Sequence, residues 1–61
     1  MDKEYLRKQY YQAILEFRTA HNEDDQWNAR KQMAKIEWTA LEMFGDEFLD
    51  EIRKENGLKA Y

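Results

Sequence analysis

The sequence predicts an all-α protein in which an antiparallel helical hairpin, at about residues 3–20 and 22–44, is followed by a short third helix at about residues 46–56. The 61 residues include no proline and only two glycines, and they are rich in residue types that favour helix. Valine is absent and β-branched residues are few, whereas a sheet would need many. Apolar residues also recur at helical spacing. We expect one domain, residues 1–61, with no linker.

The first two predicted helices have clear starting residues. Asp2 and Asn22 are good N-caps, and the three acidic residues at 23–25 complement the positive end of the second helix dipole. A short connection between the helices predicts that they are antiparallel neighbours. The first helix has one apolar stripe, made of Leu6, Tyr10, Ala13, Ile14, Phe17 and Ala20.

The central predicted helix has apolar side chains on two arcs. At about 100° per residue, the first arc contains Trp27, Ala34, Trp38 and Leu41. The second contains Ala29, Met33, Ile36, Ala40, Met43 and Phe44. The arcs are centred roughly 140° apart, wider than the roughly 60–90° at which a helix in a small bundle faces its neighbours. We therefore expect a second chain to complete a dimeric helical bundle.

Gly45 is expected to end the central helix in a left-handed conformation, and Asp46 to cap the third helix. The alternative is a helix that continues through Gly45 at a cost of about 1 kcal/mol; we favour the break. At the other end, Gly57 at the C′ position and Leu58 against Ile52 predict a Schellman motif. The tail that follows can bring Tyr61 back onto the bundle.

Self-association through the central helix is the expected mode of action. So short a chain buries little surface, and without cysteine it has no disulfide to stabilise it. In an antiparallel homodimer, the acidic end of this helix would lie near the basic middle of the other copy. The residues expected at this protein interface are Trp27, Arg30, Met33, Ala34, Trp38, Leu41 and Met43.

An acidic block lies around the start of the third helix. Paired carboxylates serve glycoside hydrolysis or di-metal centres only in a cleft or bundle core, whereas these are expected opposite the apolar stripe of their helix. We therefore predict an acidic docking patch made of Glu42, Asp46, Glu47, Asp50 and Glu51.

The remaining residues give little basis for catalysis. The only histidine, His21, stands beside three acids at a spacing that matches no zinc site, and no nucleophilic set or phosphate loop can be assembled. We expect no enzyme activity, cofactor, metal or small-molecule substrate. No apolar run is long enough for a membrane span or signal peptide, which together with the lack of cysteine favours a cytoplasmic location.

The sequence thus favours a non-enzymatic protein–protein interaction module or regulator, a homodimer that also binds a protein partner. One alternative is a dimeric regulator associated with nucleic acid, although the net charge of −3 argues against this. Its contacts to phosphate would come from the basic residues of the first helix, Lys3, Arg7, Lys8 and Arg18. A further alternative is a structural subunit of a larger assembly.

Overall fold

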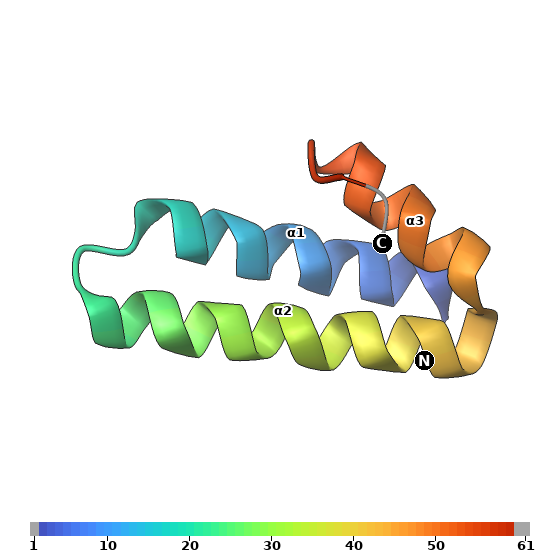
Figure 1. The fold of residues 1–61 in the computed structure, drawn as a ribbon, viewed down its shortest axis with the longest axis horizontal. Helices are drawn as coiled ribbons and strands as arrows, with labels where there is room; N and C mark the ends of the chain where they lie inside the picture. Colours follow the sequence, from blue (N-terminus) through green and yellow to red (C-terminus); the bar gives the residue numbers. More distant parts are fainter. Residues whose placement is uncertain (1, 60–61) are drawn as a thin grey trace.

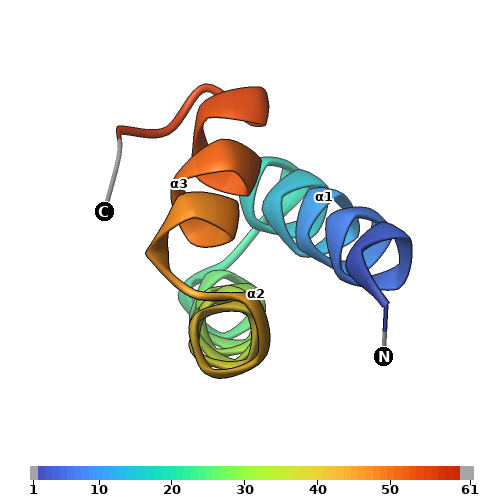
Figure 2. The same cartoon turned by 90° about the vertical axis from the view of Figure 1, so that its right-hand side faces the viewer.

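The computed structural model describes residues 2–59, which form three helices (Figure 1). Helix α1 spans Lys3–Thr19, α2 spans Glu23–Phe44 and α3 spans Asp46–Glu55. The first two lie antiparallel, and α3 turns back from the end of α2; viewed end-on, the helices occupy the corners of a triangle (Figure 2). The predicted all-α fold, a hairpin with a short third helix, is confirmed. Tyr61 lies outside the described residues.

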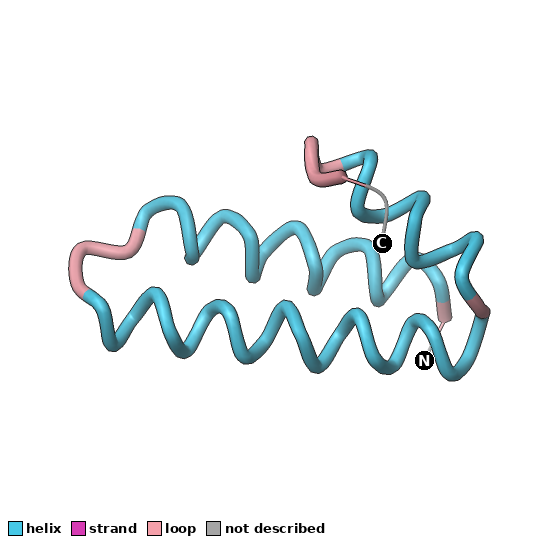
Figure 3. Tube along the Cα trace, viewed as in Figure 1, coloured by secondary structure: helices cyan, strands magenta, loops and turns pink. Residues whose placement is uncertain are grey.

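Both predicted N-caps are confirmed. The Asp2 side chain accepts a hydrogen bond of 2.8 Å from the N–H of Tyr5, and the Asn22 side chain accepts one of 2.8 Å from the N–H of Asp25. Each cap occupies backbone N–H groups that have no partner within their helix. The α1–α2 connection consists of residues 20–22, which end with Asn22, and is drawn as a short loop in Figure 3.

A single residue, Gly45, separates α2 from α3. Its φ of 85° is positive, as predicted, but its ψ of −178° places it outside the left-handed helical region. Its N–H donates to the Leu41 carbonyl at 3.0 Å and its carbonyl accepts from the N–H of Leu49 at 3.3 Å. The predicted break is confirmed, but Asp46 is wrong as the cap. Asp46 is the first residue of α3, and the capping position belongs to Gly45, which has no side chain to cap with.

The end of α3 has the hydrogen bonds of a Schellman motif. The N–H of Leu58 donates to the Arg53 carbonyl at 2.8 Å, and the N–H of Gly57 donates to the Lys54 carbonyl at 3.0 Å. Gly57 has a φ of 76°. Leu58 packs against the core, which includes Ile52.

The core draws on all three helices. Its buried members within residues 2–59 are Leu6, Tyr10, Ala13 and Ile14 from α1, Met33 and Ala40 from α2, and Phe48, Leu49 and Ile52 from α3. The contribution of α2 comes from the second arc identified in the sequence. Ile36 and Phe44 of that arc, together with Leu41 of the first, pack against the core while partly exposed. The hairpin therefore closes on the second arc.

Candidate protein–protein interface

The first arc of α2 is largely exposed. Trp27 and Trp38 each expose 62% of their surface, Ala34 between them is exposed, and Leu41 is partly buried. We call these four residues the tryptophan strip. Tryptophan is highly buried on average in folded proteins, so two exposed on one side of one helix are unusual.

The length of α3 explains why the strip is uncovered. Helix α3 has 10 residues and α2 has 22, which correspond to about 15 Å and 33 Å at 1.5 Å per residue. Returning from Gly45, α3 runs beside only the C-terminal part of α2, so the other end of the hairpin has two helices (Figure 1). Trp27 lies in the first turns of α2, beyond the reach of α3.

A groove runs along the strip between α2 and α3. It consists of two shallow hollows that share Ala34 and Glu37. The first, of about 160 Å³, is also lined by Trp38, Leu41 and Leu49. The second, of about 180 Å³, is lined further by Arg30, Met33, Arg53 and Leu58. Beside the strip, the groove is thus lined by Leu49 of α3, which is 1% exposed, and by the partly buried Leu58 of the segment after it.

A polar cluster fixes the position of α3 beside this groove. The Tyr10 hydroxyl and the Arg53 guanidinium both donate to the same carboxylate oxygen of Glu37, so the cluster joins all three helices. The Arg53 Nε also donates to the Lys59 carbonyl at 2.7 Å. Burial, followed by the hydrogen bond to Glu37, raises the pKa of Tyr10. One wall of the groove is therefore held by partly buried hydrogen bonds.

Glu37, Arg53, Leu49 and Leu58 were not predicted to belong to this surface. The sequence offers one signal for Glu37, which lies in the gap between the two apolar arcs and therefore at the edge of the core. The other three come from the α3 region, and their place depends on the angle at which α3 folds back. That angle follows from Gly45 and the polar cluster, which the spacing of apolar residues does not reveal.

The structure separates the predicted interface residues into three places. Arg30 is exposed and lines the groove beside the strip. Met33 is buried in the core at 9% exposure, so little of it is left for a partner. Met43 is 49% exposed, but it lies roughly 160° around α2 from the strip at 100° per residue. The strip with Arg30 is therefore the part that forms one continuous surface.

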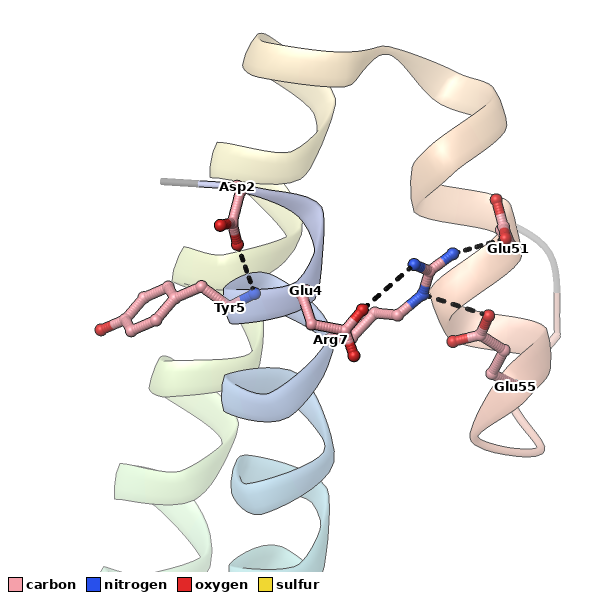
Figure 4. A network of polar contacts seen from close by, with 6 residues as sticks. All are labelled: Asp2, Glu4, Tyr5, Arg7, Glu51 and Glu55. Atoms are coloured by element: carbon pink, nitrogen blue, oxygen red, sulfur yellow. Dashed lines mark hydrogen bonds and ion pairs between the residues drawn. The ribbon is translucent and has the colours of Figure 1, made fainter.

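The predicted acidic patch is divided in a similar way. Glu51 binds the Arg7 guanidinium at 2.6 Å, and Glu55 binds the same group at 3.3 Å (Figure 4). Glu42, Asp46 and Glu47 are exposed around the α2–α3 turn, and Asp50 is partly buried. The exposed negative charge of this patch is thus concentrated around the α2–α3 turn, at Glu42, Asp46 and Glu47.

The basic residues of α1 partly face α3. Arg7 is paired with two of its carboxylates, and Arg18 donates to the Asn56 carbonyl at 3.2 Å. The Lys3 ammonium lies 5.4 Å and 5.5 Å from the ring centres of Phe44 and Phe48, while Lys8 is exposed. The ion pairs of Arg7 join α1 to α3 close to the Asp2 cap of α1 (Figure 4). They also reduce the charge that α1 presents to a polyanion.

Three further features of the described residues concern ligand binding, metal binding and membrane spanning. A hollow of about 510 Å³ beside the α1–α2 connection is lined by mainly polar residues that include Glu16, His21 and Asp25. Within residues 2–59, no three histidine, cysteine, aspartate or glutamate side chains are grouped so that they could hold a metal ion. None of the helices in that range is long and apolar enough to cross a membrane.

Comparison of the chain with models of protein families, with curated proteins and with solved structures gave no match. Support for a function therefore comes from the surface of the molecule.

Proposed function

We propose that this protein is a small interaction module and regulator that acts by associating with a second copy of itself through the tryptophan strip of α2. One observation carries the proposal. Trp27 and Trp38 are each 62% exposed on a bundle whose core is already filled by other side chains. Exposed aromatic residues on a continuous apolar surface are typical of interfaces, and tryptophan is among the residues that contribute most to binding.

The energetics favour a reversible dimer. A buried tryptophan covers about 150–250 Å², so the exposed share of each corresponds to about 90–155 Å² and about 2–4 kcal/mol at 25 cal/mol per Å². The four tryptophans of a dimer then supply about 9–16 kcal/mol, similar to the roughly 4–15 kcal/mol that association costs. The other contacts in the interface decide by how much the binding free energy exceeds the cost of association. We expect a dissociation constant in the micromolar range.

The available surface is large enough for such an interface. The chain exposes 4648 Å², and a standard interface takes roughly 800 Å² from each partner, about one sixth of that. Leu58, which is partly buried, adds apolar area beside the strip, whereas Leu49 lines the groove with only 1% of its surface exposed. Asp46 and Glu47, which are exposed at the start of α3, would remain available to a further protein partner.

The nucleic-acid alternative receives less support. Two of the four basic residues on which it depends are engaged with α3, and Arg7 is paired with two carboxylates. Phosphate binding would have to break these contacts or proceed with little net positive charge. We therefore expect no shift of nonspecific duplex DNA in a gel at low salt, and a clear shift would favour this alternative.

Light scattering on a size-exclusion column tests self-association directly. At micromolar concentration and above, the wild type should have about twice the 7.5 kDa mass of the chain. Trp38→Ala should shift the population to monomer, and Trp27→Ala should weaken the dimer. Tyr11→Ala is the matched control because Tyr11 is an exposed aromatic residue, at 58%, on α1. A monomeric wild type, or a Trp38→Ala variant as dimeric as Tyr11→Ala, would contradict the proposal.

A further inference from the structure

Charge alternates along α2 in a way that restricts how two copies can pair. The helix begins with three acidic residues at 23–25, continues with Arg30, Lys31 and Lys35, and ends with Glu42 next to the acidic turn. In a parallel dimer in register, each block faces the same block of the other copy. An antiparallel dimer centred on Ala34 also brings the two basic segments together. Both arrangements oppose like charges, which is unfavourable.

We infer that the two copies pair antiparallel with the twofold axis between residues 37 and 38 of α2, so that residues whose numbers add up to about 75 face each other. This inference rests on the proposed self-association. It moves each basic segment away from its counterpart and towards the acidic end of the other copy. About 14 residues of each α2 then overlap, from residue 31 to residue 44, or about 21 Å.

The flank of the helix supports this register. At 100° per residue, Glu42 lies between Lys31 and Lys35 in direction, about 20° from each. All three are exposed, and among residues 2–59 none of them takes part in an ion pair. A twofold axis perpendicular to two antiparallel helices brings the same flank of each copy together. Glu42 of one copy therefore falls between Lys31 and Lys35 of the other, within about 3 Å along the axis.

The apolar residues agree with the same register. Ala34 of one copy faces Leu41 of the other, a small side chain against a large one, and the two Trp38 side chains meet beside the axis. Trp27 reaches past the end of the opposite α2 to the turn at Gly45, where a Cβ would meet no atom within 4 Å. The turn thus leaves open space where an indole ring can pack.

Disulfide trapping tests the register, because the chain has no cysteine of its own. Ala34→Cys and Leu41→Cys chains are mixed under mild oxidation, and the covalent dimers are identified by mass. We expect the mixed dimer to exceed its statistical half-share, because only facing residues bring their Cα atoms within about 4.4–6.8 Å. A predominance of dimers between two Ala34→Cys chains would place the axis at Ala34 and overturn the proposed register.

A charge swap tests the same register without cysteine. Glu42→Lys alone, and the double variant Lys31→Glu/Lys35→Glu alone, should each self-associate about tenfold more weakly, since the twofold axis makes every substitution act twice. Their equimolar mixture should recover wild-type association as a heterodimer. Glu16→Lys, an exposed reversal on α1, is the control and should leave association unchanged.

The outcomes separate the two proposals. A monomeric wild type in light scattering overturns self-association and the register together. A dimeric wild type whose charge variants associate as tightly as the parent, alone and mixed, overturns the register and leaves self-association standing. Circular dichroism of each variant shows that it is folded; the charge variants alter exposed side chains, so their helix content should match the parent.

Discussion

The hydroxyl group of Tyr10 joins α1 to the polar cluster at Glu37. Its side chain is fully buried, and the hydroxyl donates to Glu37, which also accepts from Arg53. A hydrogen bond to a charged group contributes about 1.5–3 kcal/mol. Tyr10→Phe should therefore lower the free energy of unfolding by about that amount, measured by urea denaturation. Tyr11→Phe, which removes the hydroxyl of an exposed tyrosine, is the control and should stay within about 0.5 kcal/mol of the parent.

The same hydroxyl makes stability depend on pH in the alkaline range. Burial raises the pKa of Tyr10 in the folded state above the 10.0 of an exposed tyrosine. Above about pH 10, the unfolded state loses this proton while the folded state keeps it, so the free energy of unfolding falls as pH rises. The loss from this one group is up to about 1.4 kcal/mol per pH unit. Urea midpoints at pH 8 and pH 11 should differ less in Tyr10→Phe than in the parent, and equal differences would contradict this assignment.

The sequence predicts the side of α2 on which Trp38 lies but not its burial. Its position on the first arc follows from the sequence alone, but whether that arc is core or surface does not. A fully buried tryptophan would cost about 3–5 kcal/mol when replaced by alanine. With 62% of Trp38 exposed, most of that burial is absent within one chain. We expect Trp38→Ala to affect association far more than the folding of the monomer.

The three helices were predictable because each signal is local. Apolar spacing, the caps at Asp2 and Asn22, and the glycines at 45 and 57 act within a few residues of where they stand, and the observed bounds match the predictions within one or two residues. The direction of α3 depends instead on the backbone at Gly45 and on Arg53 reaching Glu37 across 16 positions. Which arc of α2 packs in the core likewise depends on contacts between helices, so the strip could be predicted only as one of two alternatives.

Gly45 sets the angle between α2 and α3 with a backbone that other residues avoid. At φ 85° and ψ −178°, an L-residue is strained by about 1–3 kcal/mol. Gly45→Ala should lower the free energy of unfolding by that amount, although a new Cβ would meet no atom within 4 Å. Gly45→Asn should cost the same, because asparagine tolerates the left-handed helical region but not this one. Urea denaturation checks both variants.

Gly57→Asn is the matched control for the turn at Gly45. Gly57 has a φ of 76° at the end of α3, in a Schellman motif where asparagine also occurs. Its added Cβ would have only the Arg18 side chain nearby, at 3.9 Å. We expect Gly57→Asn to change stability little. Equal losses in Gly57→Asn and Gly45→Asn would show that the special backbone of Gly45 is not what orients α3.

At the scale of the whole molecule, folding and association are expected to be coupled. A chain of 61 residues buries a small core, and a partner that binds only the folded state adds to its stability by mass action. The polar cluster and the Schellman motif hold α3 in place within one chain, whereas the tryptophan strip is exposed in that chain and is proposed to be buried by a second copy. Stability should therefore have one part that is independent of protein concentration and another that depends on it.

The dependence on concentration can be measured by thermal unfolding. Above its dissociation constant, a dimer gains about 1.4 kcal/mol for each tenfold rise in concentration. With an unfolding entropy of about 2.1 cal/mol/K per residue over two chains, that raises the midpoint temperature by about 5 °C. Trp38→Ala should show no such rise, because we expect this variant to remain a monomer when folded. Tyr11→Ala should behave as the parent. If the midpoint temperature of the parent did not change over a hundredfold range of protein concentration, dimer formation through the strip would not stabilise the folded state.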